Sequence, residues 1–213
     1  MKKPARRPAS SDKKDGRSTR EFILSVALTS FARDGFDGAS IPKIANLAGV
    51  APALLHYYFG SKDKLWRDTV EYSLGELRRE TSTIHNATKS LLPLDRLRAL
   101  LQAHTHFAAR WPDHFVMIIA EARADSDRFA WIQENYTGIL FDEVVTTLLD
   151  AQSRGQIEEV NVNKVASILI GSILLYFTVQ SSTLRNADYE ADSSEFTELL
   201  FRMLLNGVGI PPS

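Results

Sequence analysis

Apolar residues recur every three to four positions along most of this chain, which is the spacing of helices that each bury one face. No segment alternates strictly between apolar and polar residues over the length of a β-strand. The pattern therefore predicts an all-α fold. We expect helices at residues 18–34, 41–48, 52–59, 61–87, 93–110, 112–124, 129–154, 161–183 and 193–206.

Two of these predicted helices, 41–48 and 52–59, are short and flank a tight turn. Ser40 is suited to cap the first helix, and Gly49 follows it where a helix end favours a residue that accepts a positive φ. Val50 can plug the space between two crossing helices. Such a pair forms a helix-turn-helix, whose second helix enters the major groove of DNA. The alternative is an ordinary helical corner.

The polar surface of the second short helix favours DNA binding over a plain corner. His56, Tyr57 and Tyr58 cluster in its C-terminal half. Lys62 and Lys64 follow at the start of the next helix, where free backbone N–H groups favour a phosphate. A corner with a purely structural role rarely carries so many hydrogen-bonding aromatic and basic side chains together.

This stretch resembles the tetracycline-repressor (TetR) family of transcription regulators. The resemblance covers about residues 20–70 and rests on three patterns: A-x-x-x-F-A-x-x-G-F from Ala27, S-I-x-x-I-A-x-x-A-G-V from Ser40 and L-x-x-Y-F-x-S-K-x-x-L from Leu55. The chain departs from the usual family residues at Ala51, Leu54 and His56. These departures bear on the operator sequence and leave the fold as expected.

The resemblance implies a DNA-binding head on a helical body. We assign 1–17 to a disordered basic arm, 18–66 to the helix-turn-helix domain and 67–213 to effector binding and dimerisation. The helix at 61–87 resembles the family's lever between the two parts. The expected DNA contacts are Ser40, Lys43, Ala51, Pro52, Ala53, Leu54, His56, Tyr57, Tyr58 and Lys62.

The charge distribution agrees with this division. Residues 1–70 hold 13 basic and 7 acidic residues, a net +6, whereas residues 71–213 hold 12 basic and 19 acidic residues, a net −7. A basic segment on an acidic body is typical of a nucleic-acid-binding head. Seven basic residues among the first 17 either follow the DNA backbone or minor groove or form a solvated tail.

The last two predicted helices are apolar on more than one face, so each needs a partner on more than one side. We expect 161–183 and 193–206 to form a homodimer interface, paired into four helices across a two-fold axis. The alternative is burial of both helices within one monomer.

The chain carries no recognisable catalytic or metal-binding constellation. It has no cysteine, no Gly-rich phosphate loop, no G-x-S-x-G and no H-E-x-x-H. His104 and His106 point in different directions on a helix and cannot grip one metal together. We therefore expect no enzyme, metal or cofactor. With no signal peptide evident and no apolar run of about 18 residues, we expect a cytoplasmic protein.

An effector pocket is expected between the helices at 93–154 and 161–183, because the resemblance implies one there and this region is rich in aromatic residues. His104 is either a satisfied core histidine or a polar contact in this pocket. Glu121 or Arg123 can face inward and select a cationic or an anionic effector. The candidate walls are His104, Phe107, Trp111, Met117, Glu121, Tyr136 and Tyr176.

Together these features predict a homodimeric repressor that binds a palindromic DNA operator and is released by a small apolar or aromatic effector. Two alternatives stay open: a dimer that organises DNA without sequence preference or effector, and a helical enzyme formed by the body.

Overall fold

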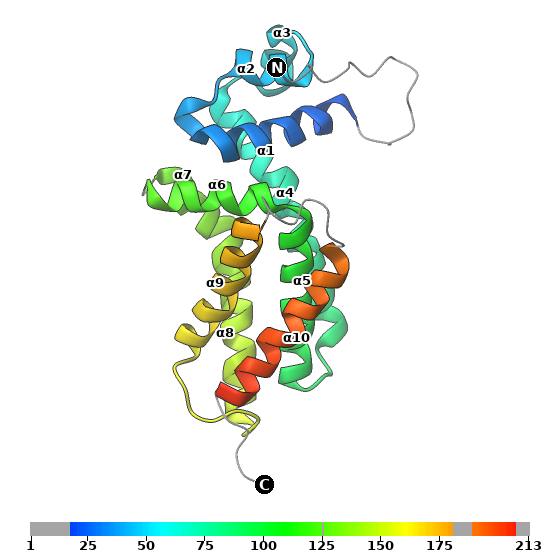
Figure 1. The fold of residues 1–213 in the computed structure, drawn as a ribbon, viewed down its shortest axis with the longest axis vertical. Coiled ribbons are helices and arrows are strands. Elements are labelled where there is room, and N and C mark those ends of the chain that lie inside the picture. The colour runs from blue at the N-terminus through cyan, green and yellow to red at the C-terminus, as the bar shows by residue number, and fades with distance from the viewer. Residues whose placement is uncertain (1–17, 125, 181–188, 208–213) are drawn as a thin grey trace.

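The computed structural model describes residues 18–124, 126–180 and 189–207, and every regular element within them is a helix (Figure 1). The all-α prediction is therefore confirmed. The helices are α1 (Thr19–Gly38), α2 (Ile41–Ala48), α3 (Pro52–Phe59), α4 (Lys62–Thr88), α5 (Pro93–Arg110), α6 (Pro112–Arg123), α7 (Asp127–Ile132), the π-helix η1 (Gln133–Thr137), α8 (Gly138–Ser153), α9 (Val162–Gln180) and α10 (Tyr189–Gly207).

Helices α1 to α3 form a head at one end of the molecule, and α4 leaves the head and runs into the body (Figure 1). Ser18 starts α1 with a reciprocal capping box to Glu21. The end predicted at Gly35 is instead a kink with φ 70° inside the helix, which continues to Gly38. The glycine signal was therefore correct in position, but it bends α1 without ending it.

The body is a bundle built from α4, α5, α8, α9 and α10, and α6 and α7 cross between this bundle and the head (Figure 1). Helix α6 packs against α1, where the Thr29 hydroxyl donates to the Asp113 carboxylate at 2.7 Å. The junction between head and body is therefore a packed surface in addition to the single helix α4.

Two further predicted helices differ from the structure. The expected single helix at 129–154 begins at Asp127 and is divided into α7, η1 and α8. A Cβ on Gly138 would lie 2.6 Å from the Gln133 carbonyl oxygen, so the backbone is tightly packed where the π-helix ends. An extra residue in a helical turn does not change apolar periodicity enough to be predicted.

The last helix begins at Tyr189, four positions before the predicted start. Its first residues add no apolar stripe, so periodicity alone placed the start too late. The predicted extension of the preceding helix to residues 181–183 lies outside the described residues.

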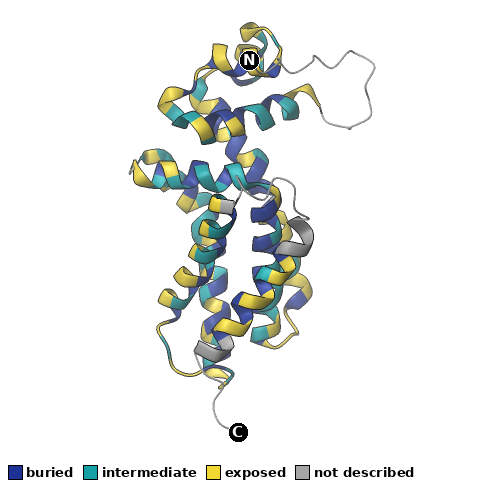
Figure 2. Cartoon of the chain, in the orientation of Figure 1, coloured by how far each residue is buried: buried dark blue, intermediate teal, exposed yellow. Residues whose placement is uncertain are grey.

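Buried apolar side chains form two clusters, and the buried positions line the interior of both head and bundle (Figure 2). One cluster joins α1–α4 of the head to Phe107, Met117 and Tyr136 of the body. The other lies among α5, α8, α9 and α10. The first cluster contains residues from both sides of the domain boundary predicted after residue 66, so head and body share one core there. The boundary itself stays a prediction.

Candidate nucleic-acid interface

The turn between α2 and α3 is held by local hydrogen bonds. The Ser40 hydroxyl accepts from the Lys43 backbone N–H at 3.3 Å, as expected of an N-cap. Gly49 adopts the left-handed conformation, with φ 67° and ψ 28°, which other residues reach only with strain. The Val50 N–H then donates to the Ala45 carbonyl at 3.0 Å. These bonds fix the path of the chain from α2 into α3.

Helix α3 is anchored on its inner side and open on its outer side. Leu55 and Phe59 are fully buried, one turn apart. Tyr57 is 82% exposed and contacts the ring of Tyr58 edge-on, with 5.4 Å between centroids. The Tyr57 ring offers a large apolar surface and its hydroxyl can both donate and accept a hydrogen bond. The open face of α3 is therefore a candidate contact surface.

Two of the lysines expected to contact phosphate already have partners within the head. The Lys62 ammonium donates to the Ala39 carbonyl oxygen at 3.0 Å and lies 4.3 Å from the centre of the Phe36 ring. The Lys43 ammonium pairs with Asp34 at 2.9 Å. An ammonium has three N–H donors, so each lysine retains donors for a phosphate. Lys62 thus also braces the head, a role that sequence alone did not show.

Asp34 of α1 is the carboxylate that pairs with both Arg33 and Lys43. The Arg33 guanidinium donates to its carboxylate at 2.8 Å and, with the Lys43 ammonium, holds the pKa of Asp34 well below its ordinary value. Asp34 therefore stays ionised and keeps the Lys43 side chain beside α2.

All ten predicted DNA contacts lie on the α2–α3 corner or at the start of α4. Seven are exposed, and Leu54, Tyr58 and Lys62 are half-buried. The corner forms the end of the head farthest from the bundle, so the body does not cover it (Figure 1).

Residues 23–68 match the sequence model of the family described as bacterial regulatory proteins, tetR family. The chain belongs to the TetR family. Among curated relatives, this TetR-family chain is 25% identical over 169 residues to the HTH-type transcriptional repressor NicS of Pseudomonas putida, with 78% of each chain covered. It is 35% identical over 83 residues to the HTH-type transcriptional regulator BetI of Rhizobium meliloti, which covers 39% of this chain and 40% of that one. The BetI match is therefore confined to less than half of each protein.

Solved structures support the fold along most of the chain. The TetR-family regulator PfmR from Thermus thermophilus superposes with a TM-score of 0.67 at 22% identity, covering 87% of this chain and 97% of that one. FadR from Bacillus subtilis, solved with stearoyl-CoA, gives a TM-score of 0.66 at 17% identity, covering 88% and 98%. At these identities the likeness shows that the TetR-family fold extends through the body.

Behind the head, Arg128 of α7 bridges the two parts of this TetR-family chain. Its guanidinium lies 3.8 Å from the centre of the Phe36 ring and 5.9 Å from that of Trp66, both at the base of the head. It also pairs at 3.0 Å with Glu121, which is 3% exposed and accepts a hydrogen bond from Ser126 at 2.6 Å. Glu121, expected to select an effector, thus already has an internal cation.

The seven residues expected to line an effector pocket are distributed over both cores. Phe107, Met117 and Tyr136 are buried in the cluster that joins head to body, whereas Tyr176 packs on the other cluster and stacks on Phe196 with 4.2 Å between centroids. Neither of the two hollows characterised among the described residues is lined by any of the seven. As an effector site they stay a prediction.

His104 and His114 are buried in the body, and burial lowers the pKa of both. The Nδ1 atom of His104 lies 2.7 Å from the Leu100 carbonyl oxygen, which fits a core histidine better than a pocket contact. His114 lies on α6, and its Nδ1 is 2.7 Å from the Ser73 hydroxyl of α4. Burial lowers the pKa of His114 to about 3, so this imidazole is neutral near pH 7.

The lowered pKa of His114 predicts loss of stability in acid. The unfolded chain binds a proton at this imidazole below about pH 6.5, whereas the folded chain resists it until about pH 3. Unfolding is therefore favoured as the pH falls through that window, by roughly 2 kcal/mol between pH 7 and pH 5. Urea unfolding at several pH values should show His114→Phe with a shallower pH dependence. Ser73→Ala, which keeps the imidazole, should retain the steep dependence.

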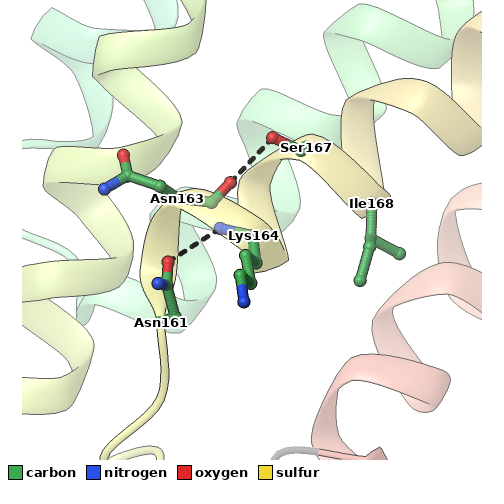
Figure 3. Close-up of a pocket in the computed structure, with 5 residues that line it drawn as sticks. All are labelled: Asn161, Asn163, Lys164, Ser167 and Ile168. Carbon is green, nitrogen blue, oxygen red and sulfur yellow. Dashed lines mark hydrogen bonds between the residues drawn. The ribbon is translucent and has the colours of Figure 1, made fainter.

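Two hollows formed by described residues lie on the body. One, of about 560 Å³, is lined by Asn161, Asn163, Lys164, Ser167 and Ile168 at the start of α9 (Figure 3). Its polar groups serve the helix itself, because the Asn161 side chain accepts from the Lys164 N–H at 3.1 Å and the Ser167 hydroxyl donates to the Asn163 carbonyl at 2.8 Å. The other, of about 270 Å³, lies between α4 and α8.

No group of three or more His, Asp or Glu side chains among the described residues could hold a metal ion. One described helix segment, Val162–Val179 in α9, is long and apolar enough to cross a membrane by length and composition, with a mean hydropathy of 1.7. The sequence expectation concerned uninterrupted apolar runs, whereas this segment includes Asn163, Lys164 and Ser167 and qualifies by its average hydropathy. Only 28% of this segment is buried within the monomer.

Proposed function

We propose that this TetR-family chain is a sequence-specific DNA-binding repressor, released from a palindromic operator by a small molecule. The observation that carries the proposal is the open face of α3, with Tyr57 exposed beside basic residues that the Gly49 turn holds in place. The name of NicS, a transcriptional repressor, supports repression over activation. The protein would act in the cytoplasm, and no enzymatic activity is expected.

In the proposed complex, α3 lies in the major groove. Tyr57 reaches base edges or the backbone, while Pro52, Ala53 and Leu54 offer apolar contact to groups such as thymine methyls. Ser40, Lys43, His56, Tyr58 and Lys62 hold phosphates and set the register. Two copies of α3 in one dimer would enter successive grooves about 34 Å apart.

Substitutions of Tyr57 and Lys62 should separate sequence reading from phosphate binding. Tyr57→Ala should lower affinity for the selected operator about tenfold while random duplex is bound as before, because a base contact carries roughly 1–3 kcal/mol of discrimination. Lys62→Ala should weaken all duplexes alike and reduce the salt slope by about one. The measurement is competition between operator and random duplex at several salt concentrations, after selection of the operator from a random pool.

Matched controls keep this test interpretable. Lys89→Ala removes an exposed lysine at the far end of α4 and should change neither value. Because Lys62 also binds the Ala39 carbonyl, its variant is compared at a temperature where thermal unfolding shows the head folded. If Tyr57→Ala and Lys62→Ala lower affinity for all duplexes equally, the assigned division of roles is wrong.

Dimerisation is proposed through α9 and α10. Helix α9 exposes Ile168 and Leu175, and α10 exposes Leu199 and Met203, at 66, 62, 45 and 62%. These positions repeat at helical spacing, opposite the buried stripes of the same helices. A second copy covering this face would bury the apolar surface of α9 and the hollow at its start, both of which are open in the monomer (Figure 3).

A DNA-organising dimer without an effector is the alternative function, and the specificity ratio distinguishes the two. A regulator should prefer its operator over random duplex by about 10³-fold or more, whereas the alternative predicts equal binding. FadR from Bacillus subtilis, which has the same fold, was solved with stearoyl-CoA. This complex supports our proposal that the present chain also binds a small-molecule effector.

A further inference from the structure

The hollow between α4 and α8 differs in character from the aromatic core. It has a volume of about 270 Å³ and is walled by side chains from two helices. The lining residues are Arg78, Thr81, Ser82, His85 and Asn86 of α4 and Ile139, Leu140 and Glu143 of α8.

Thr81 lines this hollow and carries a buried hydroxyl. It is 6% exposed, and its Oγ1 has no hydrogen-bond partner among the residues that the structure describes. The next two hydroxyls along α4 do have partners: Ser82 donates to the Arg78 carbonyl at 2.8 Å and Thr83 to the Arg79 carbonyl at 2.9 Å. A buried hydroxyl without a partner is destabilising, so its place in a hollow indicates a ligand atom as the missing partner.

Arg78 lies three positions before Thr81, hence on the same face of α4. Its guanidinium pairs with Glu71 at 3.5 Å, a long separation, and lies 5.4 Å from the centre of the Tyr136 ring. Glu71 also accepts a hydrogen bond from the Tyr136 hydroxyl. Arg78 is therefore oriented by its neighbours while most of its five donors stay available for a carboxylate, which guanidinium binds in a bidentate manner.

The opposite wall is apolar at one end and carries a hydrogen-bonded carboxylate at the other. Ile139 is 52% exposed, and with Leu140 it lies in the first turn of α8, one residue after the π-helix, a feature frequent at functional sites. Glu143 pairs with His85 across the hollow. Because Glu143 has this internal partner, its charge opposes an incoming anion less than a bare carboxylate would.

We propose that this hollow binds a small organic acid, whose carboxylate contacts Arg78 and Thr81 and whose hydrocarbon part lies on Ile139 and Leu140. The volume is slightly below that of pockets for drug-sized ligands, which selects a monocyclic or short-chain acid over a long acyl chain. The role of this acid as effector rests on the proposed function, whereas its binding does not. The acid would contact α4, the helix that begins at the DNA-binding corner.

Binding is tested on the full chain without DNA, by calorimetric titration and thermal unfolding. The probes are benzoate and hexanoate, their neutral amides, and benzylamine as a cation. At least one acid should bind with a Kd on the order of 1 mM or below, as expected for a ligand of this size, and its amide at least about tenfold more weakly. No binding of either acid at about 10 mM, or equal binding of acid and amide, would overturn the proposal.

Three variants define the site. Arg78→Met should raise the Kd of the acid at least about tenfold, and the neighbouring exposed Arg79→Met should leave it unchanged. Thr81→Val should raise the Kd about threefold or more, yet raise the Tm by about 2–4 °C, because it removes a buried hydroxyl that has no partner in the free protein. If Thr81→Val lowers the Tm and leaves the affinity unchanged, the hydroxyl is not a ligand contact.

The operator assay then separates the two proposals. Release of the wild-type chain, but not of Arg78→Met, from its operator by the acid supports the effector role. Binding of the acid without release from the operator supports the site and overturns its role as effector site. Binding by a chain that selects no operator sequence supports the site and overturns the repressor proposal.

Discussion

Leu175→Glu should convert a dimer of this chain into a monomer of 23.8 kDa. Leu175 is 62% exposed on α9, in the middle of the apolar face proposed to meet its symmetry mate. In a two-fold interface the substitution places two carboxylates in one apolar contact, and burial of unpaired like charges is strongly unfavourable. We expect the dissociation constant of the dimer to rise at least about 100-fold, equivalent to about 2.7 kcal/mol. Sedimentation equilibrium across a concentration series measures it.

A matched control is Leu149→Glu, which places the same charge at an exposed leucine of α8. It should leave the dimer intact and the circular dichroism spectrum unchanged. Operator affinity should fall about 100-fold or more in Leu175→Glu alone, because a monomer binds one half-site without the effective concentration that the dimer supplies. A Leu175→Glu chain that remains dimeric would show that the face on α9 and α10 is not the interface.

The short helices of the head could be predicted to the residue, because their ends depend on local chemistry. Ser40 caps α2, Gly49 takes the left-handed conformation that ends it, and Pro52 begins α3. Each of these signals acts on its own neighbours and needs no knowledge of the remaining fold. The start of α4 was predictable for the same reason, since the Ser61 hydroxyl accepts from the Lys64 N–H at 3.1 Å.

The body was less predictable, because its details depend on residues far apart in the sequence. Aromatic content suggested a pocket lined by Phe107 and Met117, yet both are packed in the core. The hollow between α4 and α8 is walled partly by Arg78 and Thr81, and neither residue stands out in the sequence as a candidate ligand contact. Their shared position becomes visible only when α8 is placed beside α4.

Arg128→Leu should destabilise the chain by about 4 kcal/mol, although a single arginine at a helix start carries no strong signal in the sequence. The side chain of Glu121 is only 4% exposed and loses its ion-pair partner at 3.0 Å. Removing one partner of a buried pair leaves an uncompensated charge, which typically costs about 3–5 kcal/mol. Loss of the guanidinium from the faces of Phe36 and Trp66 adds roughly 0.5–1 kcal/mol. Urea unfolding monitored by tryptophan fluorescence gives the difference.

A double-mutant cycle separates the charge from the packing. Arg128→Leu combined with Glu121→Leu should recover most of the lost stability, because apolar replacement of a whole buried pair is often nearly neutral. The exposed pair of Arg154 and Asp150 is the control, and Arg154→Leu should cost less than about 1 kcal/mol. If the double variant is as unstable as Arg128→Leu, then the loss comes from the aromatic contacts instead of the buried charge.

The same variant should loosen the head more than the bundle, because Arg128 belongs to α7 while Phe36 and Trp66 lie at the base of the head. Hydrogen exchange should rise at amides of α1 in Arg128→Leu and stay constant in the described part of α10, which packs mainly on α5. Equal acceleration in both helices would indicate global destabilisation. A rise confined to the head would instead show that Arg128 holds α7 against the DNA-binding domain through the rings of Phe36 and Trp66, so that a rearrangement of the body could reach α3 through this contact as well as through α4.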